Sequence, residues 1–242
     1  MRIALWQRLF FKFVFPIFCE LHLRNQVHFK KRLERSFLFS VNNNDTVVEI
    51  NGQKQSVGTA KNYQFITADG KSKVNLTNSF IAFSTLKYVR WELFKEGCFK
   101  VVKLFQDIYQ PSIIQRVGLR YKDVIMRSKW GLNDTPWKEL IHEKYLGVLA
   151  EDDKKKVSRY VLDYESAEDQ PIMAHRHFEL VRTSPTMNEL SLMIDCDYSV
   201  NGIMPYGVIE ELSEKLHDSS SVFLRTTITE KLHLAMNPTE LV

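Results

Sequence analysis

The sequence is poor in the residues that build several common functional motifs. Only nine glycines occur in 242 residues, and none belongs to a glycine-rich turn of the kind that cradles phosphate groups. A Gly-x-Ser-x-Gly sequence, typical of serine hydrolases, is also absent. The three cysteines, Cys19, Cys98 and Cys196, lie far apart in apolar patterns, which indicates buried thiols in a cytoplasmic protein rather than disulfides or paired zinc ligands. Nothing in the sequence points to a bound cofactor.

A long uncharged apolar run is missing as well. Thirteen of the first eighteen residues, MRIALWQRLFFKFVFPIF, are apolar, but Arg2, Arg8 and Lys12 interrupt them. A membrane-spanning helix needs about 20 residues with few or no charges, and a signal peptide needs an unbroken apolar segment with a small-residue cleavage site. The sequence therefore predicts neither feature, and contact of this segment with a membrane surface is the disfavoured alternative. We interpret residues 1–15 as a basic, aromatic extension ahead of one domain at 16–242.

The basic residues are concentrated near the start of the chain. The net charge is +4, yet residues 1–40 hold eight Lys or Arg and two Asp or Glu, so the remainder is slightly acidic. In one short stretch basic and aromatic residues interleave: Lys30, Lys31, Arg32 and Arg35, with Phe29, Phe37 and Phe39. This mixture suits single-stranded nucleic acid, but the same spacing suits a helix with solvated basic side chains. Nucleic-acid binding is an alternative here, and a solvated helix is the interpretation we favour.

Hydrophobic periodicity predicts an α+β fold. Apolar residues recur every three or four positions from Tyr88 to Tyr109, which predicts a long helix that ends before Pro111. Alternating residues predict strands at 16–24, 46–50, 62–67, 73–83, 116–125, 157–164, 171–181 and 189–198, and further helices are predicted at 135–148 and 208–223. We expect mostly antiparallel sheet with long amphipathic helices packed on one face, either as a single unit or as two similar halves, 16–130 and 131–242.

The predicted strand RVGLRYKDVI, residues 116–125, has one charged face. That face carries Arg116, Gly118, Arg120 and Lys122. Because Gly118 leaves a gap between two planar guanidiniums, a phosphate or carboxylate would fit there. Alternatively, Asp195 and Asp197 of the strand LSLMIDCDY form ion pairs with the arginines and fix the strand register. We expect the ion pairs and keep anion binding as the alternative.

Two residue pairs resemble incomplete metal sites. Asp195 and Asp197 share a strand face and would offer oxygen ligands to Mg²⁺. His175 and His177 have a spacing found in zinc sites, and a third ligand would have to come from His142, His217 or His233. Neither pair is accompanied by a metal-binding motif. We therefore favour ion pairs with the arginines for the aspartates, and exposed polar alternation for the histidines. His217 also precedes Asp218 and three serines, but adjacent helical residues point to different faces, which disfavours nucleophilic catalysis.

Several segments, in this order, resemble a sporadically distributed prokaryotic family of unknown function. They are YQFITADGKSKVNLTNSFIAFSTLKYVRWELF (63–94), IYQPSIIQRVGLRYKDVI (108–125), WKELIHEKYLGVL (137–149), LMIDCDY (192–198) and FLRTTITEKLHLAMNP (223–238). The Arg-x-Gly-Leu-Arg-Tyr hexad is the most specific, and the resemblance covers about residues 60–240. It implies no catalytic residues, and it suggests a cytosolic accessory protein linked to mobile or defence-related genes.

These observations favour a non-enzymatic cytoplasmic protein that acts through a protein partner or as a homo-oligomer. The alternative is a phosphate-handling or nucleic-acid-processing protein that uses Arg116 and Arg120.

Overall fold

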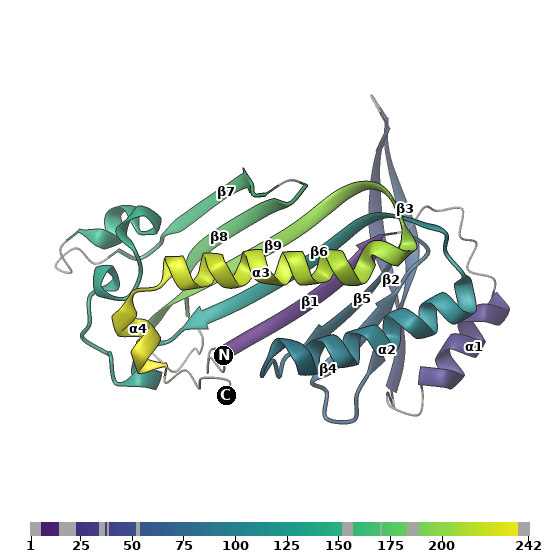
Figure 1. Cartoon of the computed structure of the whole chain (residues 1–242), viewed down its shortest axis with the longest axis horizontal. Helices are drawn as coiled ribbons and strands as arrows, with labels where there is room; N and C mark the ends of the chain where they lie inside the picture. The colour runs from purple at the N-terminus through teal and green to yellow at the C-terminus, as the bar shows by residue number, and fades with distance from the viewer. Residues whose placement is uncertain are drawn as a thin grey trace.

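The chain folds around one antiparallel sheet in the computed structural model (Figure 1). The structure describes residues 6–14, 23–33, 37, 39–51, 54–151, 157–169, 171–182 and 189–236, with side chains at 11, 12, 14, 27–33, 37 and, within those ranges, from 61 onward. The strands are β1 (Trp6–Val14), β2 (Phe39–Asn51), β3 (Lys54–Ile66), β4 (Ser72–Leu76), β5 (Phe80–Thr85), β6 (Ile113–Ile125), β7 (Val161–Ala167), β8 (Met173–Arg182) and β9 (Leu190–Pro205). The helices are α1 (Leu23–Leu33), α2 (Trp91–Tyr109), α3 (Ile209–Thr227) and α4 (Glu230–Ala235). An α+β fold with an antiparallel sheet is therefore confirmed.

The strand order in the sheet is β2-β3-β4-β5-β1-β6-β9-β8-β7. The two central strands, β1 and β6, pair with each other. After β1 the chain returns to it through an antiparallel series that ends in β5, and the 19-residue α2 follows. After β6 the chain returns in the same way through β7, β8 and β9, and the 19-residue α3 follows. The second series thus begins at β6, ahead of the boundary at residue 130 that the sequence suggested.

The interpretation of residues 1–15 as an extension is wrong. Residues Trp6–Val14 form β1, which pairs with β5 on one side and β6 on the other. Phe11 is buried in the core, whereas the neighbouring Lys12 is only half-buried on the opposite face. The basic residues that made this segment resemble a surface extension are compatible with a central strand because successive side chains point to opposite faces. Of the strand predicted at 16–24, residues 16–22 lie outside the described residues, and Leu23 begins α1.

The predicted helix at 88–109 is confirmed as α2, and its apolar stripe is buried. Trp91, Phe94, Cys98, Val101, Val102 and Phe105 are the buried residues. Phe94 packs against Phe83 of β5, with ring centroids 5.3 Å apart. The helix ends at Gln110, whose φ of 46° is left-handed, immediately before Pro111. Burying each large apolar side chain contributes roughly 1.5–3 kcal/mol, so this stripe anchors the helix.

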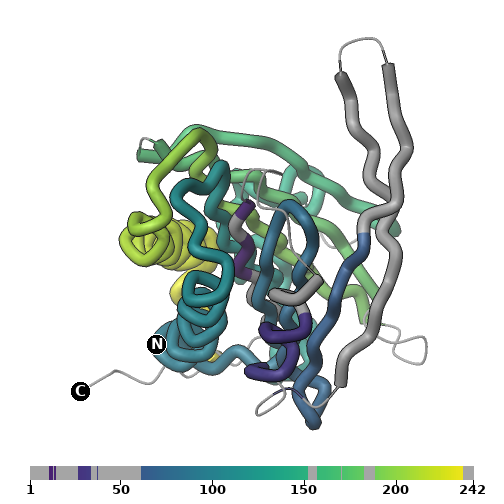
Figure 2. Tube along the Cα trace, turned by 90° about the vertical axis from the view of Figure 1, so that its right-hand side faces the viewer, coloured from purple at the N-terminus to yellow at the C-terminus, as the bar shows by residue number. Residues whose placement is uncertain are grey.

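The second long helix, α3, packs against strands near the centre of the sheet. α3 contacts β6 and β9, and α1 contacts α2. Figure 1 draws α2 and α3 in front of the sheet, and in the turned view of Figure 2 both lie to the left of the strands. None of the described helices is long and apolar enough to cross a membrane.

The helix predicted at 135–148 is wrong. This segment instead forms three short 3₁₀ turns, Trp137–Glu139, Glu143–Tyr145 and Gly147–Ala150. Its backbone pairs with the end of α3, because the His142 N–H donates to the Thr227 carbonyl and Ile141 forms a bridge with Ile228. The bond from His142 replaces one that a helix would have made. Trp137, Leu140, Ile141 and Tyr145 are buried, as the apolar spacing predicted, whereas Val148 is exposed.

Candidate functional sites on the two faces of the sheet

The arginines of β6 are held by carboxylates of β9. Arg116 donates two hydrogen bonds from Nη2 to the carboxylate of Asp197, at 3.0 and 2.9 Å. Arg120 binds Asp195 through two nitrogens, at 2.6 and 2.8 Å. The pair of Arg120 and Asp195 is bidentate, with one nitrogen for each oxygen, and such pairs are among the stronger charged contacts in proteins. The expected ion pairs are therefore present, and we call the sheet face that carries them the charged face.

The pairs run diagonally between the two strands. In the register of β6 and β9, Arg120 lies opposite Asp197 and Lys122 lies opposite Asp195. Each arginine reaches a neighbouring aspartate instead, and Lys122 adds a contact of 3.4 Å to Asp195. Asp195 is only 4% exposed. Its hydrogen bonds raise the pKa of Arg120.

The gap at Gly118 is occupied by Arg116. A Cβ atom placed on Gly118 would overlap Nη1 of Arg116 and lie 2.8 Å from its Cζ. The sequence suggested that a ligand would use this gap, and the structure fills it with a side chain of the same strand. The adjacent Lys12 of β1 has a lowered pKa, because it is partly buried and lies near the charge of Arg116.

His175 and His177 lie on the charged face and contact an acidic residue of β7. His175 Nε2 is 2.5 Å and His177 Nδ1 is 2.9 Å from the Asp163 carboxylate. His177 also lies 3.4 Å from Glu179. The described residues contain no group of three or more His, Cys, Asp or Glu that could hold a metal ion. The metal role of Asp195 and Asp197 likewise receives no third ligand from the described residues, since their oxygens accept from basic side chains.

The basic segment near residue 30 lacks exposed aromatic partners in the described residues. Lys30, Lys31 and Arg32 are exposed in the last turn of α1. Phe29 is fully buried, 5.8 Å from the Phe65 ring, and Phe37 is also buried. A stacking platform needs exposed rings, so the idea that these phenylalanines would stack on bases is wrong. Arg35 and the side chain of Phe39 lie outside the described residues.

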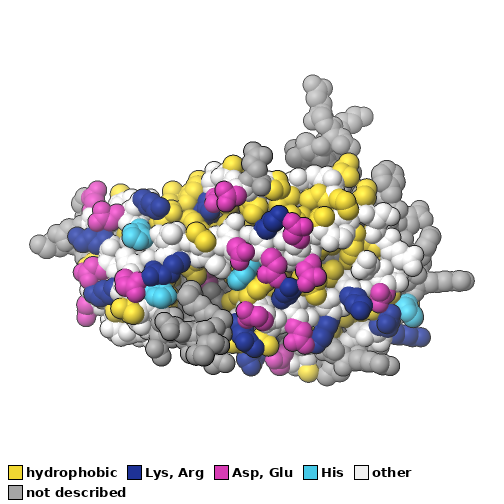
Figure 3. All heavy atoms as spheres, in the orientation of Figure 1, with side chains coloured by type: hydrophobic (Ala, Val, Ile, Leu, Met, Phe, Trp, Pro, Cys, Tyr) yellow, Lys and Arg dark blue, Asp and Glu magenta, His cyan; other side chains and the backbone are white. Residues whose placement is uncertain are grey.

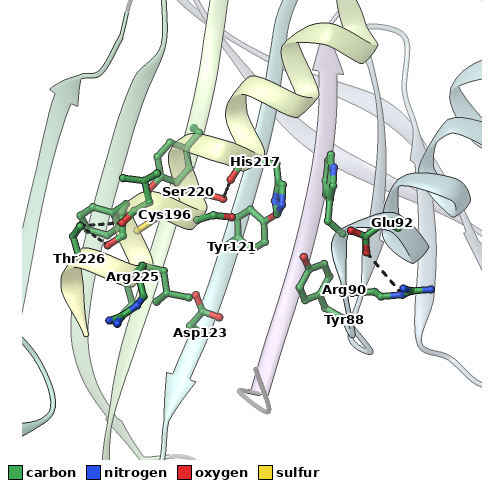
Figure 4. A pocket seen from close by; sticks show the side chains of 17 residues that line it. Tyr88, Arg90, Glu92, Tyr121, Asp123, Cys196, His217, Ser220, Arg225 and Thr226 are labelled. Carbon is green, nitrogen blue, oxygen red and sulfur yellow. Dashed lines mark hydrogen bonds and ion pairs between the residues drawn. The ribbon is translucent and has the colours of Figure 1, made fainter. Parts of the chain in front are cut away.

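A cavity of about 470 Å³ lies on the opposite face, between the start of α2 and the second half of α3 (Figure 4). Its floor is formed by β6 and β9. The ring centroid of Tyr121 lies 5.8 Å from that of Tyr88 and 6.2 Å from that of His217, and all three side chains are labelled in Figure 4. We call it the helix-face cavity. Volumes of about 300–1,000 Å³ with mostly aromatic walls are typical of small-molecule sites.

His217 is held by contacts from two other elements. Its ring stacks on Trp91 of α2, with centroids 4.4 Å apart and planes within 7°. Its Nδ1 is 2.7 Å from the hydroxyl of Tyr121. Trp91 Nε1 donates in turn to Glu214 at 2.7 Å. Burial lowers the pKa of His217 and raises the pKa of Tyr121, so both groups are neutral near pH 7.

The helix-face cavity does not contain an activated nucleophile among its described residues. Ser220 donates its hydroxyl hydrogen bond to the backbone carbonyl of His217, not to the imidazole. Cys196 is buried, and burial raises the pKa of its thiol, which leaves the nucleophilic thiolate scarce. Burial also raises the pKa of Tyr88 to about 12.

Sequence reasoning did not find the partnership of His217 and Tyr121. The two residues are 96 positions apart, and Tyr121 fitted an ordinary core pattern. One local signal existed: His217 directly follows the buried Leu216, on a helix whose apolar stripe also includes Leu212 and Phe223. An imidazole beside such a stripe needs a hydrogen-bond partner when the helix packs.

The chain matches no protein-family model and no curated protein.

Proposed function

We propose that this protein is a non-enzymatic binding protein, an accessory subunit that works through a protein partner. The main support is the pairing of Arg116 with Asp197 and of Arg120 with Asp195. An anion site would need at least one of these guanidiniums to face a ligand, and displacing a carboxylate would cost each arginine two charged hydrogen bonds. The resemblance to a family without known catalytic residues points in the same direction.

The arrangement of the elements adds to this proposal. We infer that both long helices cover one face of the sheet and that the chain consists of two similar halves, centred on β1 and β6. Acidic and basic side chains are interspersed over the described surface in Figure 3, without a broad basic area in that view. A nucleic-acid-binding surface usually has a basic face, so a protein partner fits this surface better.

The first test is to purify the full chain from its native host with its partners retained. A co-purifying protein at fixed stoichiometry, without excess absorbance at 260 nm, is the expected result. Bound nucleic acid or phosphate that disappears in the Arg116→Ala, Arg120→Ala double variant would contradict the proposal.

A charge swap separates the two roles of the arginines. The variant with Arg116→Asp and Asp197→Arg keeps an ion pair but moves the positive charge to the other strand. If the pair is structural, the swap should recover much of the unfolding free energy that is lost in Arg116→Asp or Asp197→Arg alone. Binding of inorganic phosphate by the wild-type chain, and its loss in the swap, would instead favour the phosphate-handling alternative.

A further inference from the structure

One edge of the sheet, β7, has backbone groups available for pairing. β7 is the last strand in the sheet order (Figure 1). The Tyr160 carbonyl accepts a hydrogen bond from the Leu180 N–H. Tyr160 and every second residue after it therefore direct their N–H and C=O groups toward β8. Residues 161, 163, 165 and 167 therefore direct their N–H and C=O groups away from the sheet. No hydrogen bond from another described residue reaches them.

The side chains of this edge differ between its two faces. The exposed residues alternate with half-buried ones along the whole of β7. Asp163 and Glu165 lie on the charged face, opposite His177 and His175 of β8. Tyr164 and Ser166 lie on the other face. A strand that paired with β7 would thus place alternate side chains beside two carboxylates.

A wide groove accompanies the edge on the face that carries α3. Its volume is about 980 Å³, and Tyr164 and Ser166 of β7 form one side while Val222 and Phe223 of α3 form the other. Val222 is 65% exposed. Figure 3 shows hydrophobic surface alongside the helices of this face. Apolar side chains of an added strand would be buried here.

The rim of the groove is acidic. Asp169, which follows β7, and Asp218 of α3 line it, and so does Glu168, which is paired with the buried Arg176 at 2.7 Å. Lys215 is the only exposed basic residue among its described lining residues. Glu165 lies on the other side of the same strand. The charge on both sides of the edge therefore favours a basic occupant.

We propose that the β7 edge binds an extended segment of a partner protein in which Lys or Arg alternates with apolar residues. The segment adds a tenth strand, with its basic side chains beside Asp163 and Glu165 and its apolar side chains in the groove. Strand addition of this kind draws affinity from backbone hydrogen bonds and specificity from alternate side chains. The inference rests on the proposed function, since it names the chemistry of the partner.

A second copy of the chain fits this edge less well. In an antiparallel pairing centred on Tyr164, Asp163 of one copy lies opposite Glu165 of the other, and centring on either acidic residue places it opposite itself. Like charges directly across a strand pair are destabilising.

Two substitutions at one position test the edge, and a third controls for charge. Glu165→Pro removes an outward-facing N–H without removing a hydrogen bond to β8. Glu165→Lys keeps the backbone and reverses the charge. Asp134→Lys makes the same charge change at an exposed turn far from β7 in sequence. Circular dichroism and the urea unfolding midpoint check that each full-length variant folds. If the Glu165→Pro variant does not fold, Glu165→Lys still tests the edge.

The probes are the heptapeptides Lys-Val-Lys-Val-Lys-Val-Lys and Glu-Val-Glu-Val-Glu-Val-Glu, titrated to about 1 mM, where a weak complex is still detectable. We expect the lysine peptide to slow amide hydrogen exchange at residues 161, 163, 165 and 167. Its affinity should exceed that of the glutamate peptide at least tenfold, roughly the effect of one charge-assisted hydrogen bond. Glu165→Lys and Glu165→Pro should each weaken binding by a similar factor, and Asp134→Lys should change it less than about twofold.

Other outcomes overturn the inference. They are equal binding of the two peptides, or no binding at the highest concentration. Slowed amide exchange elsewhere than in β7, or slowed exchange in β7 caused by self-association without peptide, would also overturn it. The native-host purification distinguishes this failure from failure of the proposed function. A stoichiometric protein complex that survives both Glu165 substitutions refutes the edge but not the function, whereas absence of any protein partner refutes the function.

Discussion

The guanidinium of Arg116 lies over Gly118, in space that any other side chain at position 118 would need. From there it reaches the carboxylate of Asp197 on β9 with two hydrogen bonds. The glycine and the arginine are therefore one structural unit, because the diagonal ion pair depends on the missing Cβ.

Gly118→Ala should destabilise the protein only while Arg116 is present. The added methyl displaces the guanidinium and breaks its bonds to Asp197, at a net cost of about 1 kcal/mol after the usual gain from replacing a strand glycine. In the Arg116→Ala background the same substitution should instead stabilise by about 0.5–1 kcal/mol. Urea unfolding of the four proteins in this cycle measures the coupling. Additive effects would show that the two residues do not interact.

The contact between His177 and Asp163 should make β7 pairing depend on pH. Burial opposes protonation of His177, but its bonds to Asp163 and Glu179 outweigh burial and raise its pKa. A group whose pKa is raised by folding stabilises the folded state below its unfolded pKa, about 6.5, and loses that effect as the pH rises through its folded pKa.

His177→Gln should therefore reduce stability at about pH 5.5 and have little effect near pH 8.5. Urea unfolding at both values checks this, with the exposed His142→Gln as the matched control. An equal loss at both pH values would exclude an electrostatic role for His177.

His217 should be neutral at pH 7, with its proton on Nε2. Burial lowers its pKa. A phenol is a stronger acid than a neutral imidazole N–H, so the hydroxyl of Tyr121 donates to Nδ1 and the hydrogen remains on the other nitrogen. Nitrogen NMR of the imidazole distinguishes the two tautomers.

Tyr121→Phe is the companion variant for this assignment. Removing the hydroxyl leaves a buried nitrogen without its partner and should cost about 1–2 kcal/mol of unfolding free energy. A proton on Nδ1 in the wild type would contradict the assignment, since Nδ1 would then be the donor.

The hydroxyl of Thr229 should stabilise residues 135–148, the segment whose sequence wrongly predicted a helix. This hydroxyl accepts the Leu232 N–H at the start of α4 and donates to the Glu139 carbonyl at 2.6 Å. Thr229→Ala should cost about 1 kcal/mol, the typical value for a lost N-cap, whereas Thr229→Ser should be nearly neutral. Equal unfolding free energies for the two variants in urea would rule out the hydroxyl as the cause.

The predictable parts of the fold were those encoded by local periodicity. The three- or four-residue repeat from Tyr88 to Tyr109 located α2, and the alternation in residues 116–125 assigned each side chain of β6 to the correct face. Alternation combined with opposite charge likewise placed the aspartates of β9 on the same sheet face as the arginines, although the ion pairs run diagonally. The repeat in residues 135–148 indicated burial but not backbone conformation, since apolar spacing does not reveal a competing tertiary hydrogen bond.

By itself the sequence determined the α+β class and which side chains share the charged strand face, and it favoured pairing of that face with the chain's own carboxylates over anion binding. Tertiary structure decided that β1 lies at the centre of the sheet, that His217 meets Tyr121, and that β7 is left at an edge. Each of these depends on which distant segments lie side by side. Strand pairing brings together residues far apart in the chain, and the free energy that selects one pairing over another comes from packing, hydrogen bonds and closure of the connecting loops. No short stretch of sequence contains that information.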